Sequence, residues 1–195
     1  HGAFLQAWAT FQLLRQAGHD VEIINYKNAR HHEMESVKSL LKLRNPIFAY
    51  GQWRKRRVFQ VARKSFQLTK FTTDPDELRK YRYDCVVIGS DVVWNYNIFG
   101  YDPLFFGRLN TARRLSFSAS FGSVKAGSGE TRPAEMAKDL ASFDAIAVRD
   151  ENSRKIIIET LGRDVPLTLD PTLLYDFSED LPLCSHRIKK PYILV

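Results

Sequence analysis

The hydrophobic pattern of the chain alternates between a helical spacing and short apolar runs typical of buried strands. From residue 3 to 17 apolar side chains recur three and four positions apart, which predicts an amphipathic helix that Gly18 ends. The apolar runs predict strands at 21–26, 84–88, 114–121, 144–148 and 165–169. Helical patterns lie between them at 33–82, with breaks near 45–46 and 74–75, then at 133–142 and 150–161.

Strands that alternate with helices are typical of an α/β domain with a mostly parallel sheet. The sequence therefore predicts a doubly wound, Rossmann-like fold with helices on both faces of the sheet. The chain opens on a helix and closes on an apolar run after a polar stretch. We expect residues 1–183 to form one domain whose first strand precedes His1, and residues 184–195 to be a linker and the first strand of a second, truncated domain.

Composition narrows the class of protein. The 195 residues are 44% hydrophobic and 26% charged, as in a globular protein. No apolar run approaches the roughly 20 residues of a membrane span, so we expect a cytoplasmic location. Neither cysteine has a second Cys or a His at metal-ligand spacing, and we expect no metal site.

Positive charge is concentrated in one region. The net charge is +7, from 29 basic and 22 acidic residues, but Lys27 to Arg82 alone hold 15 basic and 5 acidic residues, or +10. The densest run is Arg54, Lys55, Arg56 and Arg57. It is either a solvated helix face or a field that attracts a phosphorylated substrate, a lipid pyrophosphate or the inner membrane surface. No aromatic-interleaved basic motif indicates nucleic acid.

Polar residues follow the predicted strands at the places where ligands bind in open α/β sheets. These strand-end residues are Gly89, Ser90, Asp91, Trp94 and Asn95, then Ser118 and Ser120, then Arg149, and last Asp170. The carboxyl ends of parallel strands lie along one edge, so we expect these side chains to converge. His1 and Gly2 precede the first helix, whose N-terminal N–H groups suit an anion.

Each of these residues also has a structural interpretation. Asp91 is either a helix cap or an acid–base group, and Arg149 either pairs with a local acid or binds an anion. Trp94 either packs in the core or stacks on a sugar. Ser118 and Ser120 are either small residues that allow close packing or hydrogen-bonding groups, and Asp170 with Pro171 is either a turn or part of the cleft.

The same residues carry a family resemblance. Six blocks, in order and spanning nearly the whole chain, resemble the polysaccharide pyruvyl transferases. They are 1–7 (HGAFLQA), 18–26 (GHDVEIINY), 87–95 (VIGSDVVWN), 118–122 (SASFG), 147–153 (AVRDENS) and 169–174 (LDPTLL).

The resemblance implies one half of a two-domain architecture similar to the GT-B glycosyltransferases. It implies transfer of a pyruvyl group from phosphoenolpyruvate to a sugar of a cell-surface polysaccharide or its lipid-linked precursor, which forms a pyruvate ketal. Phosphoenolpyruvate is the donor and no cofactor is expected. The second half would supply much of the donor pocket, so we expect this piece alone to be inactive.

The candidate roles follow from the chemistry. The planar fork of Arg149 suits a carboxylate or a phosphate, and Asp91 is the candidate acid–base group. The candidate substrate contacts are His1, Gly2, Gln6, Gly89, Ser90, Trp94, Asn95, Ser118, Ser120 and Asp170. Two alternatives stay open: a nucleotide-sugar glycosyltransferase of the same architecture, and a non-catalytic carbohydrate-binding domain.

Overall fold

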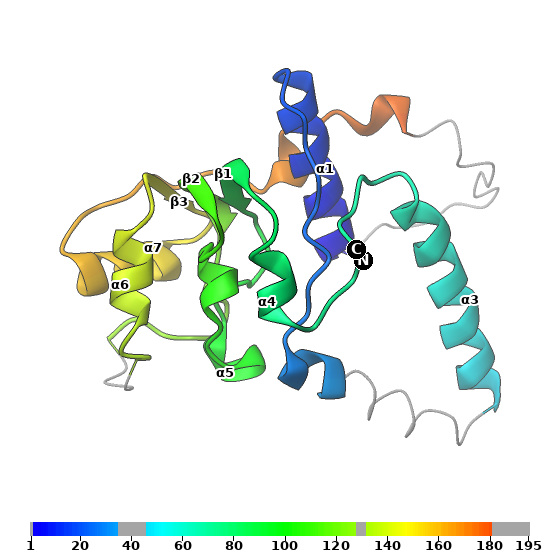
Figure 1. Cartoon of the computed structure of the whole chain (residues 1–195), viewed down its shortest axis with the longest axis horizontal. Coiled ribbons are helices and arrows are strands. Elements are labelled where there is room, and N and C mark those ends of the chain that lie inside the picture. The colour runs from blue at the N-terminus through cyan, green and yellow to red at the C-terminus, as the bar shows by residue number, and fades with distance from the viewer. Residues whose placement is uncertain (1, 35–45, 128–131, 181–195) are drawn as a thin grey trace, which may run out of the picture.

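A sheet of three parallel strands forms the centre of the molecule (Figure 1). The computed structural model describes residues 2–34, 46–127 and 132–180. The strands lie in the order β1, β2, β3, with bounds Tyr83–Ile88, Thr111–Ala119 and Ala145–Val148. Val87 pairs with Leu115, and Leu115 pairs with Ala145, all in parallel. The predicted α/β class with a parallel sheet is confirmed.

Two predicted strands, 21–26 and 165–169, do not form as strands and make only isolated bridges. Segment 165–169 makes one parallel bridge, between Leu167 and Val148. Pro166 has no N–H to continue the ladder, which limits this segment to an extended stretch beside β3. Segment 21–26 makes isolated bridges to segment 67–72 and joins no named strand within the described residues.

The predicted helices at 3–17, 133–142 and 150–161 are confirmed, but the helical pattern over 33–82 is confirmed only in part. Residues 67–72 form bridges to segment 21–26, and residues 79–82 lie outside any named helix. The α-helices are α1 Gly2–Gln16, α3 Pro46–Arg63, α4 Pro75–Leu78, α5 Tyr96–Phe99, α6 Met136–Ala141 and α7 Glu151–Leu161. Short 3-10 helices are η2 Pro103–Phe106, η3 Pro171–Leu173 and η4 Phe177–Glu179. Both predicted breaks are prolines that open helices, because the fixed φ of proline suits the first turn. Gly18 follows α1 at φ +89° and its amide bonds the Arg15 carbonyl.

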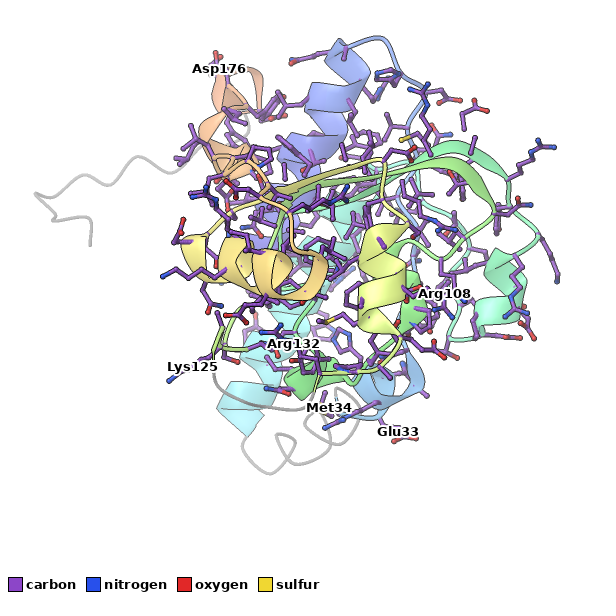
Figure 2. All side chains as sticks on the ribbon, turned by 90° about the vertical axis from the view of Figure 1, so that its left-hand side faces the viewer. Glu33, Met34, Arg108, Lys125, Arg132 and Asp176 are labelled. Carbon is purple, nitrogen blue, oxygen red and sulfur yellow. The ribbon has the colours of Figure 1, made fainter. Side chains whose placement is uncertain are left out.

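The sheet lies between two groups of helices. Figure 1 places α6 and α7 on one side of it and α1 and α3 on the other. On the first side, Arg108 lies beside α6 (Figure 2) and its Nε donates to Asp139 at 2.9 Å. The core under these helices is rich in aromatic rings, with Trp94 stacked on Phe106 and against Phe121.

Several predictions concern parts of the chain beyond these elements. Residues 181–195 lie outside the described residues, so the boundary near 183 and the truncated second domain stay predictions. Within the described ranges no helix is both long and apolar enough to span a bilayer. The same ranges hold no group of three or more His, Cys, Asp or Glu side chains placed to bind a metal ion.

Candidate active site

The end of β2 is bent by an irregularity at Ser118. The pairing register with β3 shifts between Ser116 and Ala119, and Ser118 has a φ of +57°. A side chain other than glycine in this region is strained by roughly 1–2 kcal/mol, and such strain clusters at functional sites. The bend brings the buried Ser118 hydroxyl to the segment after β3, where it donates to the Leu169 carbonyl at 2.6 Å and bonds the Thr168 hydroxyl at 2.8 Å. Ser118 thus fixes the backbone immediately before Asp170.

Asp170 joins three elements that are far apart in sequence. Its Oδ1 accepts from the Thr172 amide at 3.0 Å and the Thr172 hydroxyl at 2.7 Å, which caps η3. Its Oδ2 accepts from Gln6 Nε2 of α1 at 2.5 Å and from Arg149 Nη1, just beyond β3, at 2.9 Å. Three predicted site residues, Gln6, Arg149 and Asp170, therefore meet at one carboxylate.

The electrostatics of this corner keep Asp170 charged. Burial alone raises the pKa of Asp170, but hydrogen bonds from Thr172, Gln6 and Arg149 outweigh it, and the pKa lies below its ordinary value. The side chains of Arg149 and Asp170 are 27% and 19% exposed, so the ion pair is partly buried yet reachable from solvent. Within the described part of the chain, Asp170 is the one side chain that Arg149 binds, through Nη1. The guanidinium has further N–H donors, and they bond no other described side chain.

Ser120 has a different set of partners. Its hydroxyl donates to Asp150 Oδ2 at 2.7 Å and accepts from the Gly122 amide at 3.0 Å. Asp150 caps α7 by accepting from the Ser153 amide at 2.8 Å. Ser120 therefore ties the end of β2 to the start of α7 through hydrogen bonds, and its predicted contact with substrate stays a prediction.

The loop after β1 lies beside the end of β2. The Asp91 carbonyl accepts from the Ser120 amide at 3.3 Å, while the exposed Asp91 carboxylate accepts from the adjacent Val92 amide at 2.8 Å. Ser90 is buried, and its hydroxyl has no hydrogen-bond partner in the described part of the chain. At Gly89 an added Cβ would meet nothing within 4 Å, so space is open above this backbone.

Trp94 and Asn95 belong to the core of the domain. Trp94 has no exposed surface, its Nε1 donates to the Phe105 carbonyl at 3.1 Å, and its ring stacks on Phe106. Asn95 is also buried, where Oδ1 caps α5 and Nδ2 donates to Ser123 Oγ at 3.0 Å. This placement corrects the expectation that Trp94 stacks on a sugar, because a fully buried ring offers no face. It equally favours capping over substrate contact for Asn95.

The other predicted residues are placed as follows. Gly2 is the first residue of α1, and an added Cβ there would meet nothing within 4 Å. His1 lies outside the described residues. The sequence reasoning missed Thr172 and Asp150 as partners of the site. A threonine two residues after Asp170, and an aspartate directly before α7, are the signals that would have identified both as capping pairs.

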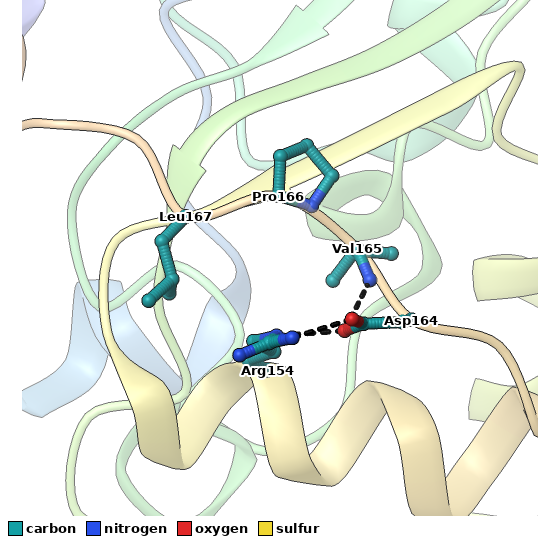
Figure 3. A pocket seen from close by; sticks show the side chains of 5 residues that line it. All are labelled: Arg154, Asp164, Val165, Pro166 and Leu167. Atoms are coloured by element: carbon teal, nitrogen blue, oxygen red, sulfur yellow. Dashed lines mark hydrogen bonds and ion pairs between the residues drawn. The ribbon is translucent and has the colours of Figure 1, made fainter.

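An open hollow of about 420 Å³ lies away from these residues, between α7 and the segment 164–167 (Figure 3). Arg154 lines it, and its Nε donates to Asp164 Oδ1 at 2.7 Å. The side chain of Arg154 also bonds Glu151. Hydrogen bonds from Arg154 lower the pKa of Asp164. This second Arg–Asp pair lies outside the predicted site and offers a matched comparison for Arg149.

A known protein family matches nearly the whole chain. The model of the polysaccharide pyruvyl transferase family matches residues 1–194. The chain belongs to the polysaccharide pyruvyl transferase family. No curated protein and no solved structure matches it. Membership confirms the resemblance and implies an enzyme with a donor substrate and a glycan acceptor.

Proposed function

We propose that this pyruvyl transferase transfers the pyruvyl group of phosphoenolpyruvate to a sugar of a cell-surface polysaccharide or its lipid-linked precursor, in a GT-B-like architecture with a second Rossmann-like half. The observation that carries the proposal is the meeting of Gln6, Arg149 and Asp170 at the edge where parallel strands end. Ligands of open α/β sheets bind at this edge.

The reaction requires a cation beside the donor. One sugar hydroxyl adds to C2 of phosphoenolpyruvate as the methylene carbon takes up a proton to become a methyl group. A second hydroxyl of the same sugar then attacks C2, the bond from C2 to the phosphate oxygen breaks, and phosphate leaves with the remaining proton. Donor and phosphate are both anionic, so a preorganised guanidinium stabilises the charge that develops on the leaving group.

Arg149 is the residue that we assign to this charge. Asp170 holds one nitrogen, Nη1, and thereby fixes the plane of the guanidinium fork. The other N–H groups of Arg149 bond no other described side chain. They are suited to bidentate binding of the carboxylate or phosphate of phosphoenolpyruvate. Gln6 and Thr172 hold Asp170 in turn, so the arginine is oriented before the donor arrives.

The loop after β1 is proposed to meet the substrates as well. The unpaired buried hydroxyl of Ser90 is destabilising by about 1–3 kcal/mol unless a ligand or water satisfies it. An added Cβ at the adjacent Gly89 would meet nothing within 4 Å, so the backbone beside Ser90 is open to a ligand. The exposed carboxylate of Asp91 is the proposed acid–base group, or the acceptor of a sugar hydroxyl.

Ligand-induced thermal shifts test the donor. A donor at about 100 times its Kd stabilises the folded protein by about 2.7 kcal/mol. We expect phosphoenolpyruvate to raise the Tm of the full-length protein by roughly 5–10 °C at that ratio. UDP and GDP sugars should leave the Tm unchanged.

The controls separate the competing functions. Arg149→Ala should abolish the shift, and Arg154→Ala should preserve it. A shift with a nucleotide sugar but not with phosphoenolpyruvate would favour the glycosyltransferase. A shift with glycan alone, without phosphate release in the presence of phosphoenolpyruvate, would favour a carbohydrate-binding domain.

A further inference from the structure

The outer face of α3 combines exposed apolar and cationic side chains. At 100° per residue, six side chains fall within about 140° of the helix circumference. We call them the outer face: Tyr50, Trp53, Arg54, Arg57, Val58 and Val61. Its apolar members are well exposed, with Tyr50 at 64%, Trp53 at 52%, Val58 at 62% and Val61 at 67%. Four large exposed apolar side chains on one short stretch of helix form a patch rather than scattered surface residues.

The opposite face of α3 attaches the helix to the rest of the molecule. Phe59 lies on that side, and its ring packs edge-on against Phe4 of α1 with centroids 5.6 Å apart. The outer face therefore points away from the contact with α1. In Figure 1, α3 lies at the margin of the molecule, across α1 from the sheet.

The charge of this region is of one sign. From residue 46 to 73 the sequence holds seven basic residues and no acidic one: Arg54, Lys55, Arg56, Arg57, Arg63, Lys64 and Lys70. Arg57 lies over the ring of Trp53 at 5.0 Å from its centroid, and Tyr50 stacks near Trp53 with centroids 5.9 Å apart. The aromatic side chains and the cations thus form one surface rather than separate zones.

We propose that the outer face of α3 binds the surface of an anionic lipid bilayer. A helix that lies in a bilayer interface places apolar and aromatic side chains at the headgroup–acyl boundary and its cations among lipid phosphates. Trp and Tyr are enriched at that depth. A protein-docking face has an apolar centre and a polar rim. Here Arg54 and Arg57 lie between the apolar residues, and their long side chains can extend to lipid phosphates while their stems stay beside the apolar surface.

Two features argue against nucleic acid as the partner. The phosphate backbone of a nucleic acid binds cations but does not bind exposed valine side chains. Val58 and Val61 lie within the outer face itself. Base-stacking proteins instead combine aromatic platforms with a basic groove. The outer face of α3 is instead the convex surface of a single helix. The bilayer satisfies both kinds of side chain at once.

Vesicle flotation tests the proposal directly. We expect the protein to bind vesicles of phosphatidylcholine with about 30% phosphatidylglycerol, and to bind pure phosphatidylcholine vesicles far less. The double variant Arg54→Gln with Arg57→Gln should weaken binding about 30-fold, because each cation near an anionic surface contributes several-fold. Trp53→Ser with Val58→Ser should weaken it about tenfold.

The matched control removes the same charge elsewhere. Lys155→Gln with Arg163→Gln lowers the net charge by two at exposed positions in and after α7, which lies across the sheet from α3 in Figure 1. This control should bind vesicles like the wild-type protein. Tryptophan emission should move to shorter wavelength on binding, and Trp53→Phe should bind while losing that shift.

Four results would overturn the proposal. The first is no binding to anionic vesicles, and the second is equal weakening by the α7 control. The third is binding of a short DNA duplex as tight as vesicle binding, with the same dependence on Arg54 and Arg57, which would make α3 a general polyanion site. Vesicle binding should also weaken as salt rises from about 0.05 M to about 0.5 M, and binding that is unchanged by salt would likewise contradict the account.

Discussion

Two polar corners of the same sheet edge have opposite characters. The loop after β1 ends in Trp94 and Asn95, whose side-chain polar atoms bond within the domain and whose side chains are buried. The corner of Arg149 and Asp170 is partly exposed, and the guanidinium keeps donors directed at no other described side chain. Both corners lie in blocks with the family pattern, so one family pattern contains polar residues buried in the core and polar residues partly open to solvent.

The difference lies in where the hydrogen bonds go. A buried polar side chain whose partners are all backbone or core atoms fixes a conformation and has nothing left for a ligand. A charged side chain with one partner and partial exposure is oriented and still able to bind. Substitutions in the first corner should therefore change stability, and substitutions in the second should change chemistry.

The largest loss of stability is expected at Trp94. Trp94→Ala removes a ring packed against Phe106 and Phe121 and should destabilise the fold by about 3–5 kcal/mol. Urea unfolding followed by circular dichroism measures this. Trp53→Ala, at an exposed tryptophan, should change the free energy of unfolding by less than about 0.5 kcal/mol. Similar losses for both variants would contradict the core assignment of Trp94.

Gly122 should be the next most sensitive position. It has a φ of +59°, and an added Cβ would lie 2.8 Å from Val92 Cγ1 and 2.9 Å from Asn95 Nδ2. Gly122→Ala should destabilise by roughly 2–4 kcal/mol, from backbone strain plus overpacking. Gly162→Ala shares the positive φ but meets nothing within 4 Å, so it isolates the strain alone. Equal unfolding free energies for the two variants would contradict the expected clash of the new Cβ with Val92 and Asn95.

Asn95 should show a smaller effect. Asn95→Ala removes the cap of α5 and the bond to Ser123, with an expected loss of about 1–2 kcal/mol. The control Asn97→Ala lies two residues along in the same helix and is exposed. If Asn95→Ala instead left stability intact and removed activity, Asn95 would have a role in the reaction, as proposed for Arg149.

Asp170 should affect stability least and in a pH-dependent way. Its pKa is lowered in the folded state, so its charge stabilises the fold above the ordinary carboxyl pKa, and this contribution is lost as pH falls through the folded value. Asp170→Asn keeps the cap and removes the charge, and should destabilise by about 1 kcal/mol or less at pH 7. Unfolding at pH 7 and at pH 3 should show the difference from wild type shrinking in acid. A difference that is as large at pH 3 as at pH 7 would mean that the charge is not its cause.

The sequence predicts the framework of this edge better than its fine structure. The spacing of apolar residues and the positions of glycine and proline locate β1, β2, β3, α1, α6 and α7. The parallel sheet then places residues 89–91, 118–120, 149 and 170 on one edge. Which of them keep free hydrogen-bonding capacity depends on tertiary contacts. The bend at Ser118, the burial of Trp94 by Phe106 and the bond from Gln6 to Asp170 depend on contacts that periodicity alone does not pair.

One measurement tests the central claim most directly: phosphate release from phosphoenolpyruvate by full-length Arg149→Ala, with acceptor glycan present. If Arg149 stabilises the leaving phosphate, kcat/KM should fall by about 100-fold or more, since removing one such donor typically raises the barrier by roughly 3 kcal/mol. The unfolding free energy should stay near that of wild type. Arg154→Ala breaks the Arg154–Asp164 pair, which lies outside the predicted site, and should release phosphate at the wild-type rate. A folded Arg149→Ala protein with near wild-type turnover would contradict the account.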